Sequence, residues 1–280
     1  MEIRLKTLTP IWTGGVDQKW DSLHDTGIVG SLRWWCEALV RGMGGYACDP
    51  SKNKCEYKKD IGQKSICVTC NLFGCTGWSR KFRFIIIDNN GNPLTFKLEK
   101  GMVFSMRFVE LRPLSSEEKW LLHKTIWLIS KYGSIGGKTT FKPSEGQEKQ
   151  KKLHHQDFGL ISLESRLPKF TKYQKEKVQE YFKCFKQDLK PPPEWPNLNF
   201  FFFSKGKYLS RPQINDLMKQ VAFLKGKIGE SKKVFSFQKE GGKIWGYVKD
   251  KNMLLSVIEK LNKLGITEII KGYELIQNEI

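Results

Sequence analysis

The spacing of apolar residues in the last third of the chain predicts alternating strands and helices. The apolar run Asn199–Ser204 has strand composition, and Ser210 followed by Arg211 and Pro212 is typical of a helix start. That helix carries apolar residues at helical spacing as far as Leu224. The elements expected after it are strands Lys233–Gln238 and Lys243–Lys249 around a Gly241-Gly242 turn, a helix capped by Asp250, and strand Ile266–Ile270.

The first half of the chain predicts the same order of elements. The expected elements are strand Glu2–Leu8, helix Ser31–Arg41, strands Lys81–Asp88 and Met102–Leu111, a helix capped by Ser115 or Ser116 that runs through Ile129, and strand Phe158–Glu164. Residues 43–80 are rich in Gly, Cys and Lys and are interpreted as an inserted loop. Residues 166–196, with a charged helix Lys172–Phe185 and Pro191–Pro193, form the expected junction.

Both halves therefore have the order βαββαβ, which is the ferredoxin-like motif. The predicted fold class is α+β, with an N-terminal ferredoxin-like domain over 1–165 that contains the insertion, and a C-terminal one over 197–280. RNA-recognition modules use a four-stranded sheet of this kind to stack bases. The fold alone does not establish that function, because ferredoxin-like domains serve many functions.

The charge of the chain changes this picture. The 280 residues include 48 Lys and Arg against 29 Asp and Glu, a formal net charge of +19. Such an excess favours a polyanionic partner, above all nucleic acid, over the alternative of a solvated lysine-rich surface. No apolar stretch approaches the ~18 residues of a membrane span, and the first residues lack the apolar region of a signal peptide. We expect a cytoplasmic protein without a membrane partner.

Four cysteines are clustered within the insertion. Cys48, Cys55, Cys67 and Cys70 lie within 23 residues, and the Cys-x-x-Cys pair suits two corners of a tetrahedral zinc site. A Lys- and Gly-rich loop cannot build its own core, so a structural zinc ion would supply its stability. Cys75 is a possible substitute ligand, and unliganded thiols are the alternative. Cys36 and Cys184 fall on expected helices and are assigned to the core.

Two glycine-rich segments are candidate anion sites. Gly27–Trp35 places glycines at the expected start of a helix, where backbone N–H groups favour a phosphate, with Arg33 and Arg41 on nearly one face. The alternative is that Arg33 pairs with Glu37 and is structural. Tyr132–Thr140 lacks the first glycine of a P-loop and follows a helix, so it predicts a hairpin close to a nucleic-acid backbone, or a simple helix cap and turn.

At these residues the chain resembles the RAMP superfamily of CRISPR proteins, most closely the first RAMP subunits of type III-B (Cmr) effector complexes. The resemblance rests on Trp12–Gly15 with Asp17, Gly27–Gly45, Ala47–Pro50 and Leu72–Arg83, and it continues through Ser134–Ser144. Gly30-Ser31-Leu32-Arg33 is similar, in degenerate form, to a superfamily segment that lies at the guide-RNA backbone. The resemblance implies two ferredoxin-like domains, in agreement with the pattern above.

The resemblance also implies a role in antiviral defence. It is that of a non-catalytic RNA-binding subunit that contacts guide RNA and target RNA beside other Cmr-type subunits. The expected RNA-binding residues are Gly30, Ser31, Arg33, Arg41, Arg80, Lys81, Gly136, Gly137, Lys138 and Lys142, and the expected stacking residues are Trp12, Trp34, Trp78 and Phe141. We expect Arg33 and Lys138 to share one basic groove.

The alternative function is a RAMP endoribonuclease that cuts single-stranded RNA. Asp17 follows a glycine pair, as does the metal-dependent cutting residue of other RAMP subunits, and His24 is a second candidate. Because the resemblance is to a subunit that does not cut, Asp17 is assigned no catalytic role.

Overall fold

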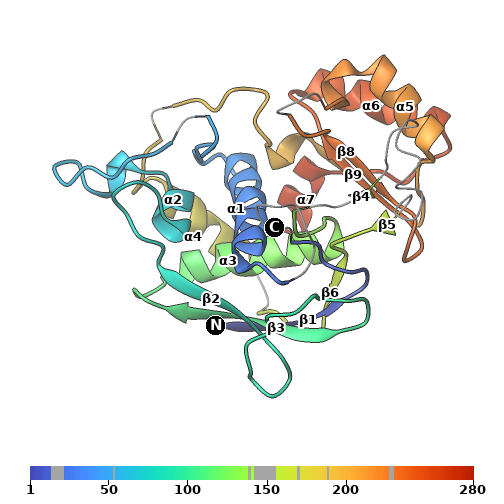
Figure 1. Ribbon diagram of the computed structural model, residues 1–280. Helices are drawn as coiled ribbons and strands as arrows, with labels where there is room; N and C mark the ends of the chain where they lie inside the picture. Colours follow the sequence, from blue (N-terminus) through green and yellow to red (C-terminus); the bar gives the residue numbers. More distant parts are fainter. Residues whose placement is uncertain are drawn as a thin grey trace.

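The computed structural model describes residues 1–13, 22–52, 54–137, 140–141, 156–168, 171–187, 189–226 and 230–280. Its first sheet is antiparallel and has the strand order β2-β3-β1-β6. The strands are β1 (Glu2–Thr7), β2 (Phe82–Ile87), β3 (Val103–Glu110) and β6 (Ile161–Leu163). Helices α1 (Asp25–Gly42) and α3 (Ser116–Lys131) cover one face of this sheet (Figure 1).

Local sequence signals account for most of these elements. Residues of β1 alternate between exposed and buried, as in a strand with one solvated face. Ser115 caps α3 in a reciprocal capping box with Glu118, as its position before the apolar face of the helix predicts. The solvated face of the sheet carries the exposed Glu2, Arg4 and Lys6 of β1.

A second antiparallel sheet follows, in the order β10-β7-β9-β8. Its strands are β7 (Phe201–Lys205), β8 (Val234–Phe237), β9 (Lys243–Tyr247) and β10 (Ile270–Lys271), and its helices are α5 (Arg211–Gln220), α6 (Lys251–Lys263) and α7 (Gly272–Asn278). Ser210 and Asp250 cap α5 and α6 as predicted. Both sheets are compatible with the two predicted ferredoxin-like arrangements.

The remaining described elements belong to neither four-stranded sheet. They are α2 (Val68–Phe73), α4 (Lys172–Phe182), the two-stranded pair β4 (Thr140–Phe141) and β5 (Gln156–Asp157), and 3₁₀ turns at Gln63–Ser65, Leu198–Phe200 and Ala222–Leu224. Among the described residues, no helix has both the length and the apolar character needed to cross a membrane.

At strand β7, the second sheet is buried on both faces. Phe202 packs with the core under α5 and α6, whereas Phe201 and Phe203 on the opposite face belong to the core that contains α1. The ring centroids of Trp35 on α1 and Phe201 lie 5.6 Å apart. A strand buried on both faces has a continuous apolar run instead of an alternating one. Strand β7 therefore offers no open face for stacking bases, contrary to the expectation from the fold, whereas on the same face Phe235 of β8 is half-buried and lines a cavity.

The structure differs from several predicted element boundaries. Helix α1 begins at Asp25 and not at Ser31, because Ile28 is as fully buried as Leu32 and extends the apolar stripe toward the N-terminus. The glycines of Gly27–Trp35 therefore lie within the helix and not at its start. The last strand is only Ile270–Lys271, and α7 after it was not predicted. Cys184 follows the end of α4 and is exposed, whereas Cys36 is buried as expected.

Candidate functional site

Four buried cysteines of the insertion converge on one point. The Sγ atoms of Cys48, Cys55, Cys67 and Cys70 all lie within 4.8 Å of one another. Cys67 is the N-cap of the short helix α2, so its Sγ and that of Cys70 lie on the same side of the first turn. Cys75, the possible substitute, is not in this group.

The spacing of the four sulfur atoms fits a tetrahedral metal ion. A Zn–S bond of ~2.3 Å implies neighbouring sulfurs about 3.8 Å apart. The Sγ of Cys48 lies 3.3 Å from that of Cys70 and 3.9 Å from that of Cys67. These separations are too long for a disulfide, whose S–S bond is about 2.05 Å. The predicted cysteines are thus brought together in a geometry compatible with a metal site.

Arg33 faces this cluster. Its Nη2 donates to the Sγ of Cys70 at 3.1 Å, its Nη1 to the Gly74 carbonyl at 2.8 Å, and its Nε to Glu37 at 2.8 Å. Burial opposes the charge of this guanidinium, but Cys70 and Glu37 together raise the pKa of Arg33. The ion pair with Glu37 is the alternative weighed for Arg33 from the sequence.

Arg41 lies on the other side of Glu37 and is 4% exposed. Its three nitrogens donate to the carbonyls of Ala47, Pro196 and Cys48 at 2.8–2.9 Å. Burial raises the pKa of Glu37 to about 7, although Arg41 and Arg33 both act to lower it. Arg41 therefore holds the insertion against α1 and is not on a surface that RNA could reach.

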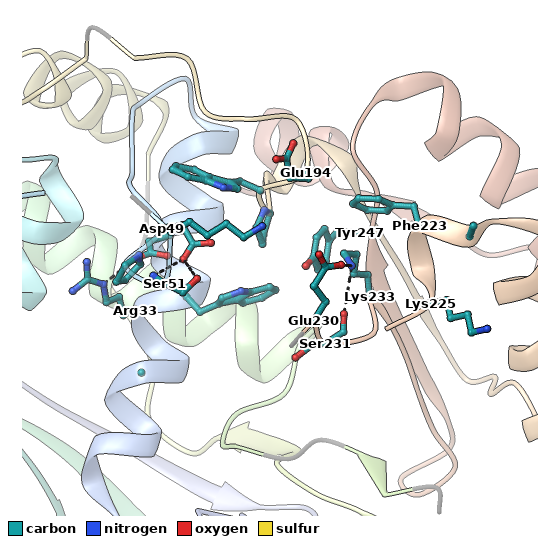
Figure 2. A pocket seen from close by; sticks show the side chains of 18 residues that line it. Arg33, Asp49, Ser51, Glu194, Phe223, Lys225, Glu230, Ser231, Lys233 and Tyr247 are labelled. Carbon is teal, nitrogen blue, oxygen red and sulfur yellow. Dashed lines mark hydrogen bonds and ion pairs between the residues drawn. The ribbon is translucent and has the colours of Figure 1, made fainter. Parts of the chain in front are cut away.

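A cleft lies between α1 and the second sheet and contains two adjoining cavities. The larger, of about 750 Å³, is bounded by α1, by residues 49–52 and 194–196, and by the second unit. Figure 2 shows Asp49 and Ser51 on one side of it and Phe223, Tyr247 and Lys233 on the other. Its charged lining residues are balanced: the cations are Arg33, Lys52, Lys225 and Lys233, and the anions are Glu37, Asp49, Glu194 and Glu230.

The smaller cavity, of about 390 Å³, brings the two glycine-rich segments together. Gly30 and Ser31 of α1 line it together with Gly136 and Gly137. Trp34 lines both cavities and its ring contacts Trp35, Phe201, Trp245 and Tyr247, with centroids 5.1–6.0 Å away. The sequence placed these segments near one edge, and the structure shows both lining this cavity.

The other side chains that were predicted to contact RNA lie outside the lining of the two cavities and contact other residues of the protein. Lys81 donates to both carboxylate oxygens of the fully buried Glu118, at 2.8 and 2.9 Å. The guanidinium of Arg80 lies over the ring of Phe82. Trp78 is paired with Tyr57 and lies 3.9 Å from the guanidinium of Arg112.

Some predicted residues lie outside the described part of the chain. These are Asp17, Lys138, Lys142 and the side chain of Phe141. Trp12 is half-buried and its carbonyl accepts from the N–H of Gly137 at 2.9 Å.

The comparison with protein families gives a match over the N-terminal part of the chain, which holds strands β1, β2 and β3 of the first sheet. Residues 4–141 match the RAMP superfamily. The match supports a RAMP protein of CRISPR systems, with a role that involves RNA. The RAMP match runs from β1 to β4, so it includes α1, the cysteine cluster and the glycines of the smaller cavity. No curated protein matches the chain.

Sequence reasoning missed the contribution of the second unit to the cleft. Lys232, Phe235, Trp245 and Tyr247 line the smaller cavity from β8, β9 and the residue pair before β8. Trp245 and Tyr247 are two residues apart on β9 and therefore share one face of the sheet. Aromatic residues at alternate positions of a strand were the available signal, but they do not show what packs against that face.

Proposed function

We propose that the protein is a non-catalytic RNA-binding subunit of a type III-B (Cmr) CRISPR complex, contacting guide and target RNA beside other Cmr-type subunits. The observation that carries this proposal is the cleft, where both glycine-rich segments meet aromatic side chains of the second sheet. The RAMP match and the net charge of +19 support RNA as the ligand. The absence of catalysis is proposed because the sequence resembles a RAMP subunit that does not cut.

The proposed contacts are those that line the cleft or adjoin it in sequence. Gly30, Ser31, Gly136 and Gly137 line the smaller cavity, and Trp34 offers a ring. Lys138 and Lys142 follow the second glycine segment and supply positive charge. Arg80 is a further cation, outside the cleft lining.

Zinc is the metal that we assign to the cysteine cluster. Four thiolates in a tetrahedral arrangement are typical of structural zinc sites, in which no position is left for a substrate. Cys48, Cys55, Cys67 and Cys70 would hold the ion, and Arg33 would offset the negative charge of the thiolates. Bound zinc would fix the insertion onto α1, the helix that lines the cleft.

Titration of labelled single-stranded RNA tests the proposed function. If about six phosphates are neutralised, log K should fall against log salt with a slope near −4, since single strands give about −0.7 per contact. The same RNA should keep its length in the presence of Mg²⁺ or of EDTA. A slope near zero would contradict RNA binding, and EDTA-sensitive shortening of the RNA would favour the endoribonuclease.

A further inference from the structure

The smaller cavity differs chemically from the larger one beside it. The larger cavity is lined by four cations and four anions, whereas Lys232 is the one charged residue among the described lining of the smaller cavity. The remaining lining consists of glycine, serine and aromatic residues. A site of this composition suits a flat and largely uncharged ring, with a phosphate at most near Lys232.

The aromatic walls offer stacking surfaces of the required size. Phe235 and Trp245 are stacked, with centroids 4.2 Å apart and planes 27° apart. Trp245 in turn contacts Trp35 at 4.9 Å. Phe235 and Trp34 are half-buried, so their rings are the ones still accessible from the cavity. The ammonium of Lys232 lies 5.6 Å from the centre of the Phe235 ring, close to any base stacked there.

Two polar groups of the lining are buried without a partner among the described residues. They are the indole Nε1 of Trp245, in a residue that is 3% exposed, and the hydroxyl of Ser134, in a residue that is 2% exposed. Both atoms are closed off from solvent, so a ligand acceptor would recover the cost of their missing hydrogen bonds only after the lining side chains shift. Nucleobases carry ring nitrogens and carbonyl oxygens that accept such bonds at the edge of a flat ring.

We infer that the smaller cavity accepts one unstacked nucleobase of single-stranded RNA, which stacks on Phe235 or Trp34. This inference rests on the proposed function and adds a specific subsite to it. The cavity volume of about 390 Å³ has room for one base and part of its sugar, and not for a duplex. Gly30, Gly136 and Gly137 add no side chain to the lining, which leaves room for the ribose and phosphate that follow the base.

Gly30 provides a substitution that fills the cavity without disturbing the core. A Cβ at Gly30 would meet no atom within 4 Å, and the residue has ordinary helical geometry inside α1. Gly30→Leu should therefore keep or raise the melting temperature, because leucine favours a helix more than glycine does. The matched control is Ser256→Leu, which adds a similar side chain to the exposed face of α6.

The experiment measures, by fluorescence anisotropy at one salt concentration, the Kd of a short oligouridine. It compares this value with the Kd of an abasic strand, which has the same sugar-phosphate backbone without the bases. Stacking of one base should make the abasic strand about 5- to 150-fold weaker for the wild type. Gly30→Leu should weaken the base-containing strand and leave the abasic strand nearly unchanged, so that the two Kd values converge. Ser256→Leu should keep the wild-type ratio.

A second pair of variants tests the stacking ring itself. Phe235→Leu keeps apolar volume but removes the flat ring, and it should also reduce the ratio of the two Kd values. Its control is Phe96→Leu, at an exposed phenylalanine outside the cavity lining.

The outcomes separate this inference from the proposed function. If the wild type binds neither strand, the proposed function fails. If the wild type binds both strands equally, or if folded Gly30→Leu and Phe235→Leu keep the wild-type ratio, RNA binding stands and the base-binding cavity is overturned.

Discussion

Nη2 of Arg33 lies 3.1 Å from Sγ of Cys70, so α1 and the cysteine cluster share a charged contact. An arginine that the sequence offered as a phosphate ligand thus has its guanidinium directed at a thiol. The same guanidinium also contacts Glu37 and the Gly74 carbonyl. The contact joins the cysteine cluster, which we expect to hold zinc, to α1, the helix that lines the cleft.

Arg33→Gln should weaken metal retention and stability together. Loss of a partner that hydrogen-bonds a metal ligand typically lowers metal affinity by about 10- to 100-fold. We expect faster transfer of zinc to a chromogenic chelator, a lower melting temperature, and an unchanged RNA affinity of the folded protein. Arg80→Gln is the control, since Arg80 does not contact the cluster, and it should retain zinc. Zinc transfer at the wild-type rate from Arg33→Gln would contradict this role.

Elemental analysis of protein purified without chelator should find about one zinc ion per chain. Cys70→Ser should lose the ion and speed amide hydrogen exchange around the four cysteines, since no common ion then holds their sulfur atoms together. Cys184→Ser removes an exposed thiol outside the cluster and should keep the zinc. Equal hydrogen exchange in the wild type and Cys70→Ser would show that the insertion is ordered without metal.

Lys81→Met should destabilise the fold more than it affects RNA. Glu118 is fully buried and accepts from Lys81, from Asn71 at 2.6 Å and from the Tyr181 hydroxyl at 3.0 Å. Removing the cation leaves a buried carboxylate without its counter-charge, which typically costs about 3–5 kcal/mol. Urea denaturation measures the loss, and the double variant Lys81→Met with Glu118→Gln should recover part of it. A loss below about 1 kcal/mol would mean that the pair is well solvated.

Lys243 should make stability rise with pH. Burial lowers its pKa to about 8, with Lys205 adding to the effect, while its ammonium donates to the Gly133 carbonyl at 3.3 Å. Between pH 8 and the ordinary lysine pKa of about 10.4, the unfolded chain holds this proton and the folded chain releases it. Stability should therefore increase over that range, by at most about 1.4 kcal/mol per pH unit.

The control for this pH effect is Lys243→Met, which removes the ammonium of Lys243 and leaves the other titrating groups in place. Lys124 has a pKa lowered to about 8 by burial as well, so the difference between wild type and variant isolates Lys243. Thermal or urea unfolding at pH 7.5 and pH 9.5 should show a smaller rise for the variant. Parallel curves would show that Lys243 is solvated in the folded protein.

Signals confined to a short stretch of chain predicted most of the fold. The caps at Ser115, Ser210 and Asp250 and the alternation in β1 depend on neighbours a few residues away, so they survive in the folded protein. The cysteine cluster was predictable for the same reason, because Cys67 and Cys70 lie in one helical turn. The start of α1 was not predictable in this way, because only the structure shows that Ile28 is buried in the core.

The cleft could be predicted only in part. Gly30 and Gly136 were placed near one edge from the order of the elements, but the opposing wall comes from β8 and β9, about 100 residues later in the chain. The role of Lys81 depends on Glu118, which is 37 residues away and buried. Charge patterns along the chain do not distinguish a lysine facing a ligand from one facing an internal carboxylate.

The burial of Phe201 and Phe203 against α1 has a practical consequence for dissecting the molecule. A fragment comprising residues 197–280 would present these rings, with Trp245 and Tyr247, to water as one contiguous aromatic wall. Such a fragment should self-associate or bind chaperones instead of behaving as a free-standing module. We therefore expect the two sheets to unfold together, and studies of either half need the other half present.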